Sequence, residues 1–129
     1  LPLHPDLPPE TVDDIISFVG EFTCGNGSPR STRYVTLLNL LRDYVLSPKQ
    51  LKKAIPLSLA YTDIVDRLIK QPYCDPDLLD HIYRLIKNKG GGDHRTNGRL
   101  NLVRHRQAKL ATWMYNHNHT QPPYPRELP

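Results

Sequence analysis

The sequence predicts an all-α protein, a compact bundle of five to six helices with extended proline-rich termini. Apolar residues recur at the i, i+3, i+4 spacing of an amphipathic helix, and no segment alternates apolar and polar residues over strand length. The 13 prolines lie mostly near the ends and between these segments, where they delimit short helices. Because 129 residues form one hydrophobic core, we expect a single helical domain over residues 9–116, with 1–8 and 117–129 as extended or disordered termini.

Apolar stripes predict the first two helices. The first helix opens at Pro9, since a proline in the first turn loses no helical hydrogen bond, and it ends by the glycine-rich stretch 24–27. Its stripe consists of Val12, Ile15, Ile16, Val19 and Phe22. The second helix follows Ser31-Thr32, and its stripe runs from Tyr34 to Val45. This is the most hydrophobic segment, so we expect it to be the central helix.

A capping box predicts the third helix. In the segment Ser47-Pro48-Lys49-Gln50, the serine hydroxyl can accept a hydrogen bond from the backbone N–H of Gln50. The glutamine side chain can in turn accept one from the backbone N–H of Ser47. We expect this helix to end near Ile55, because Pro56 disfavours helical geometry in the residue before it.

Three further helices complete the bundle. A stripe from Ala60 to Ile69 predicts the fourth helix, and a cap residue followed by proline, Asp75-Pro76, opens the fifth. The fifth helix stops at the glycines 90–92. The sixth helix, over residues 99–115, has a mixed pattern of apolar and charged residues.

The charge of the chain is concentrated near its C-terminal end. Residues 87–109 carry one acidic residue, Asp93, and seven basic residues: Lys87, Lys89, Arg95, Arg99, Arg104, Arg106 and Lys109. Such a one-sided positive field attracts polyanions, and arginine donates to phosphate in pairs. The sequence therefore predicts a non-enzymatic helical module that binds a polyanion through these seven residues, with Lys87 and Lys89 steering the approach. Among polyanions, RNA or DNA is the favoured partner. Their helical spacing predicts one solvent face for Arg99, Arg106 and Lys109.

Other chemistry finds little support in the sequence. There is no phosphate-binding glycine motif, no triad-like pattern and no paired cysteine or histidine spacing, so we expect no catalytic site, no cofactor and no metal site. His117 and His119 lie one residue apart in a proline-rich tail, and Cys24 and Cys74 each stand alone. No apolar run approaches the roughly 18 residues of a membrane-spanning helix.

Two alternatives remain open. One is a helical interaction or adaptor domain of a regulatory or viral protein, which docks a partner through its grooves or its proline-rich tail. Within that tail, Tyr124-Pro125 followed by Leu128 resembles the short tyrosine-proline-leucine motifs that membrane-budding machinery recruits.

The second alternative is a secreted protein with a Cys24–Cys74 bridge and glycans at Asn26 and Asn118. With at most one bridge, an intracellular location, cytoplasm or nucleus, is the expectation. Oligomeric state stays open.

Overall fold

The computed structural model describes residues 9–21, 29–90 and 92–129, and six helices make up most of this part of the chain. They are α1 (Pro9–Glu21), α2 (Pro29–Asp43), α3 (Pro48–Ser58), α4 (Thr62–Ile69), α5 (Pro76–Lys89) and α6 (His94–His117). No strand occurs among the described residues, and the all-α prediction is confirmed. None of these helices is both long and apolar enough to cross a bilayer.

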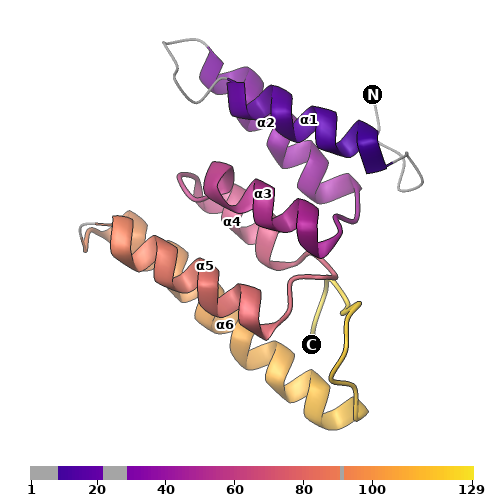
Figure 1. The fold of residues 1–129 in the computed structure, drawn as a ribbon. Coiled ribbons are helices and arrows are strands. Elements are labelled where there is room, and N and C mark those ends of the chain that lie inside the picture. The colour runs from indigo at the N-terminus through magenta and orange to yellow at the C-terminus, as the bar shows by residue number, and fades with distance from the viewer. Residues whose placement is uncertain (1–8, 22–28, 91) are drawn as a thin grey trace.

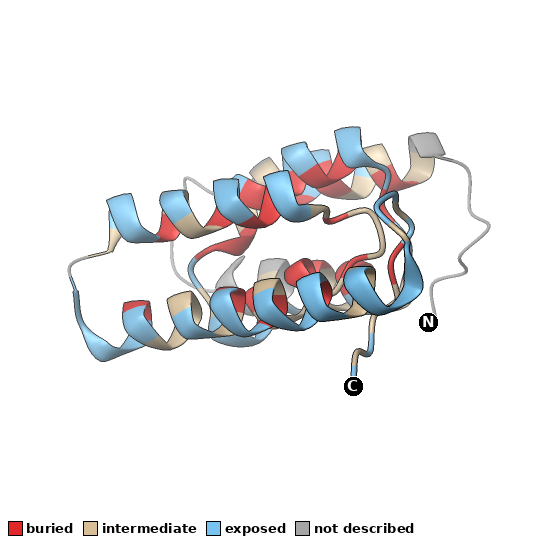
Figure 2. Ribbon diagram, turned by 90° about the horizontal axis from the view of Figure 1, so that it is seen from below, coloured by how far each residue is buried: buried red, intermediate tan, exposed pale blue. Residues whose placement is uncertain are grey.

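The helices pair into three hairpins that stack on one another: α1 with α2, α3 with α4, and α5 with α6 (Figure 1). Helix α4 packs extensively against α2, α3 and α6, whereas α2 packs against α1 and α4. The centre of the stack is therefore α4, not α2 as its hydrophobicity suggested. Buried residues occupy the sides of the helices that face one another (Figure 2). Half of α4 is buried: Ile64, Val65, Leu68 and Ile69.

Local capping chemistry sets the starts of α3 and α5 as predicted. The Ser47 Oγ accepts the Gln50 N–H at 3.2 Å, and the Gln50 Oε1 accepts the Ser47 N–H at 2.9 Å. The Asp75 carboxylate accepts the Leu78 N–H at 2.8 Å. The predicted end of α3 at Ile55 is wrong, because the helix continues through Pro56 to Ser58. Pro56 lies in the last turn, where its missing N–H removes one hydrogen bond without ending the helix.

Helix α6 starts five residues earlier than predicted. Asp93 is its N-cap, and the carboxylate accepts the Thr96 N–H at 2.8 Å. The loop before it is tight, since a Cβ on Gly90 would collide with the Thr96 side chain. The early start places Arg95 in the first turn of α6 and Arg99 in the second.

The segment after α6 is extended, as expected, yet it packs as part of the domain instead of ending free. It runs back from the end of α6 towards the middle of the stack (Figure 1). Tyr124 is 2% exposed, its N–H donates to the Pro72 carbonyl at 2.8 Å, and its hydroxyl donates to the Thr120 carbonyl at 2.8 Å. The budding-type motif noted in the sequence thus has its tyrosine in the core.

Candidate functional site

Three of the seven predicted binding residues lie together at the end of the α5/α6 hairpin. Lys89 and Arg99 line the same cavity, and Arg95 lies one helical turn before Arg99 on the same side of α6. Lys89 and Arg95 are exposed, and Arg99 is half-buried. We call Lys89, Arg95 and Arg99 the hairpin-end cluster. They are the part of the basic segment that the fold brings together.

No carboxylate among the described residues forms an ion pair with the hairpin-end cluster. Ion pairs among the described residues join other partners: Arg42 to Asp43, Lys70 to Asp66, and Arg84 to Asp80. Asp93 is the acidic group nearest in sequence, and its carboxylate is engaged by Thr96. Hydrogen bonds from Thr96 lower the pKa of Asp93 from its ordinary value, and the charge of Arg99 acts in the same direction. Asp93 thus attenuates the positive field here without forming an ion pair with any of the three cations.

Lys87 and Arg104 belong to a different surface. Lys87 is two residues from Lys89 and so lies about 200° around α5 from it. It shares the side of α5 on which Tyr83 sits one turn earlier. The Tyr83 hydroxyl accepts hydrogen bonds from the Nε and Nη2 of Arg104 at 2.9 and 2.6 Å. The Arg104 guanidinium also lies 4.7 Å from the centroid of the Tyr83 ring. Both basic side chains are exposed, on the side of the hairpin away from the hairpin-end cluster.

Arg106 corrects the predicted solvent face. Its side chain is 4% exposed, with Nη1 donating to the Arg126 carbonyl at 3.0 Å and Nη2 donating to the Pro125 carbonyl at 2.7 Å. Burial lowers the pKa of this guanidinium from its ordinary value. Arg106 therefore anchors the tail and takes no part in an exposed basic surface.

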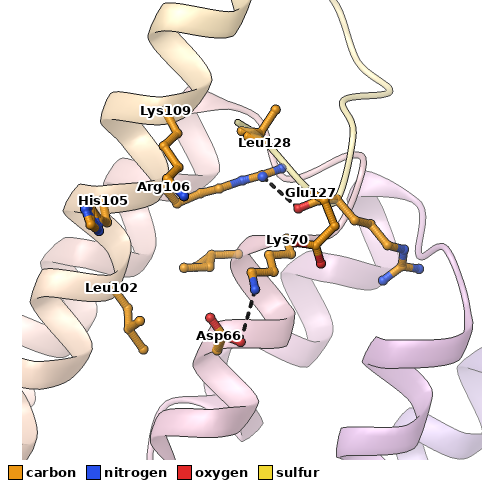
Figure 3. Close-up of a pocket in the computed structure, with 10 residues that line it drawn as sticks. Asp66, Lys70, Leu102, His105, Arg106, Lys109, Glu127 and Leu128 are labelled. Carbon is orange, nitrogen blue, oxygen red and sulfur yellow. Dashed lines mark hydrogen bonds and ion pairs between the residues drawn. The ribbon is translucent and has the colours of Figure 1, made fainter.

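Lys109 lines a second, charged cavity of about 160 Å³ between α4, α6 and the tail (Figure 3). Lys70 at the end of α4 and Arg126 from the tail line it as well, together with the carboxylates of Asp66 and Glu127. Sequence reasoning missed Lys70 and Arg126, because both lie outside the basic segment and reach this cavity only through the fold. Lys70 is already paired with Asp66 at 3.4 Å, so this cavity is less positive than its lysines and arginines suggest.

Comparison with known proteins adds nothing to this geometry. No protein family, curated protein or solved structure matches the chain.

Among the described residues, His117, His119 and Cys74 contact neighbouring side chains or are buried by them. No group of three or more His, Cys, Asp or Glu residues within the described ranges could hold a metal ion. His117 stacks on the Trp113 ring with centroids 4.4 Å apart, and His119 forms a T-shaped pair with the same ring, with centroids 5.3 Å apart. Cys74 is a free, buried thiol, and burial raises its pKa to about 12. Cys24 and Asn26 lie outside the described residues, whereas Asn118 is exposed at the end of α6.

Proposed function

We propose that the protein is a non-enzymatic helical module that binds a nucleic acid, RNA or DNA, through the hairpin-end cluster. The observation that carries this proposal is the grouping of Lys89, Arg95 and Arg99 at one helix junction, with no ion pair to any described carboxylate. Cations that are exposed and unneutralised can each take a phosphate and release its counterions. Sequence preference should be modest, because phosphate contacts position a protein without reading bases.

The positions of Lys89 and Arg95 relative to the helix dipoles distinguish a binding site from an ordinary solvated basic surface. Lysine in the last turn of a helix is favourable, because it faces the negative end of the helix dipole, so Lys89 has a structural explanation. Arg95 has none, since it lies in the first turn of α6, at the positive end of that dipole. A cation placed where it disfavours the helix supports a role outside folding.

Nucleic-acid titrations by fluorescence anisotropy at several salt concentrations test the proposal. The double variant Lys89→Gln with Arg95→Gln should bind more weakly and should flatten the plot of log K against log salt by about 0.7–0.9 per lost phosphate contact. The matched control is Lys49→Gln with Lys52→Gln, two exposed lysines on α3. Affinity that does not fall with salt, or equal losses in both double variants, would reject the hairpin-end cluster as the interface.

A second pair tests the other basic surface. Lys87→Gln with Arg104→Gln removes the two cations on the Tyr83 side of the hairpin. We expect a smaller loss than for the hairpin-end cluster, because Arg104 is already held by Tyr83. A larger loss would move the interface to that side.

The adaptor alternative rests on a different feature. Burial of Tyr124 leaves the docked tail unable to enter a partner's groove as an extended peptide. What remains is a mainly apolar groove of about 330 Å³ between the start of α5 and the second half of α6, lined among others by Pro76, Ala111 and Met114. Binding of a protein partner that survives high salt would favour this function over nucleic-acid binding.

A further inference from the structure

Arg99 differs from Arg104, Arg106 and Arg126 because its half-buried guanidinium has few hydrogen-bond partners. Its one hydrogen bond with the described residues runs from Nη2 to the Thr96 Oγ1 at 3.5 Å. Its Nε, like that of Arg106, is buried with no partner. Arg104, Arg106 and Arg126 each donate two hydrogen bonds of 3.0 Å or less. A half-buried guanidinium with unfilled donors is unfavourable by itself and suits an anionic acceptor that arrives from outside.

The cavity beside Arg99 combines this cation with apolar walls. It has a volume of about 230 Å³ and lies between the end of α3 and the hairpin-end cluster. Pro56, Leu59 and Ile86 form apolar walls, and Lys89 and Arg99 supply the charge. A cavity of about 150 Å³ accommodates a benzene ring, so this one has room for a single heterocyclic base. A matching ligand carries an anionic group and, a few bonds away, a flat ring whose faces are weakly polar. A nucleotide has both, because its sugar joins the phosphate to the base.

The two ends of the connection between α5 and α6, Gly90 and Asp93, are held in place. Gly90 packs so closely on Thr96 that no larger residue fits, and Asp93 caps the same turn. These contacts fix the backbone positions from which Lys89 and Arg99 extend, at the end of α5 and in the second turn of α6. A site whose backbone is ordered before the ligand arrives loses less conformational entropy on binding.

We propose that this cavity receives one unpaired nucleotide, with its base against Pro56, Leu59 and Ile86 and its phosphate on Arg99 and Lys89. The inference rests on the proposed function and narrows it to single-stranded nucleic acid. A base inside a duplex is stacked on both faces and paired along one edge, and it cannot enter such a cavity unless it is first extruded, which costs free energy. Single strands present their bases without that cost.

Three probes of equal length and phosphate number test the inference by anisotropy at one salt concentration: a single-stranded oligonucleotide, the corresponding duplex, and a single strand whose bases are all removed. We expect the intact single strand to bind about tenfold more tightly than either of the others. Affinity for the base-free strand equal to that for the intact strand would overturn the inference, since only phosphates would then be recognised. This comparison uses the unaltered protein and depends on no variant.

Two substitutions locate the site. Ala60 is exposed and lines the cavity, so Ala60→Trp should fill it and lower single-strand affinity about tenfold while leaving duplex affinity unchanged. Ala108→Trp is the matched control, because Ala108 is exposed on α6 and lines none of the described cavities. Equal single-strand affinity of a folded Ala60→Trp protein and the wild type would overturn the site.

The failures of the two proposals are distinguishable. Equal, salt-dependent binding of the wild-type protein to single strand and duplex would overturn the nucleotide site and leave the proposed function standing. Absence of binding to all three probes at low salt would reject both.

Discussion

Arg106 and Arg126 form a relay that ties the last helix to the second one. Arg106 donates to the carbonyl of Arg126 at 3.0 Å, and the Arg126 side chain donates to the carbonyls of Leu41 and Tyr44 at 2.9 and 2.7 Å. Gln71 Nε2 donates to the same two carbonyls, at 2.6 and 2.8 Å. The carbonyls that α2 leaves unpaired at its end are therefore satisfied by side chains from distant parts of the chain.

We expect Arg106→Ala to destabilise the protein by about 3 kcal/mol, because it leaves two tail carbonyls without their charged donor and removes a buried side chain. Arg104→Ala is the matched control: Arg104 is exposed, and its loss should cost less than about 1 kcal/mol. Urea unfolding followed by circular dichroism measures both. Similar unfolding midpoints for the two variants would contradict the anchoring role of Arg106.

Gln71 and Arg126 should be energetically coupled, because they share the Leu41 and Tyr44 carbonyls. In Gln71→Ala or Arg126→Ala each carbonyl keeps one donor, whereas in the double variant it keeps neither. The double variant should lose about 1 kcal/mol more than the two single losses together. A double-mutant cycle of urea unfolding free energies measures this term, and simple additivity would show that the two side chains act independently.

Sequence reasoning succeeded where the determinants of structure are local. The caps at Ser47 and Asp75 depend on residues three positions apart, so their patterns are visible in the chain. The start of α6 was missed because Asp93 lies in a short stretch between glycines and basic residues that carries no apolar stripe. The hydrogen bond from the Thr96 N–H to the Asp93 carboxylate is nevertheless local. An aspartate at this position, directly before the helix, is a sequence signal that could have been used.

The candidate site was predicted less well, because exposure depends on what packs against a helix. Spacing places Arg99, Arg106 and Lys109 along one side of α6, but only Lys109 is exposed there. Arg106 is buried against the tail, and Arg99 is half-buried beside the end of α3. The partners of Arg106 are carbonyls 19 and 20 residues further along, in a segment that proline content marked as free. Hydrophobic periodicity carries no information about where such a segment will dock.

Cys74 should be unreactive in the folded protein. Burial raises its pKa to about 12, so at pH 8 the thiol is protonated as well as inaccessible, and the thiolate is the reactive form. In a Cys24→Ser background, where only Cys74 can react, a thiol reagent should label the chain only after denaturant is added. Arg106→Ala should raise the native labelling rate, because it loosens the tail that covers this region. Labelling of the native protein at the rate of the unfolded chain would contradict the burial of Cys74.

Asp93 should oppose nucleic-acid binding while it caps α6. Because the folded pKa of Asp93 lies below its ordinary value of 3.8, the ionised carboxylate stabilises the fold at neutral pH, and this contribution is lost as the pH falls through the folded pKa. Asparagine caps as well as aspartate but carries no charge. Asp93→Asn should therefore tighten nucleic-acid binding at neutral pH and remove this part of the acid destabilisation. Anisotropy titrations at pH 7 and thermal unfolding from pH 2 to 6 measure the two effects.

Arg95 provides the sharpest test, because folding and binding should respond to its replacement in opposite directions. Arg95→Glu replaces a cation in the first turn of α6 by an anion, which the positive end of the helix dipole favours, so stability should rise by about 0.5 kcal/mol. The same change reverses a charge in the hairpin-end cluster, so nucleic-acid affinity should fall.

Lys49→Glu is the control for the Arg95 prediction. It also places an acidic residue in the first turn of a helix, α3, but far along the chain from the hairpin-end cluster. It should stabilise the protein by a similar amount and leave affinity nearly unchanged. If Arg95 were only part of a solvated surface, Arg95→Glu and Lys49→Glu would behave alike in both unfolding and binding. A gain in stability joined to a loss of affinity in Arg95→Glu alone is the result expected of a residue retained for its ligand.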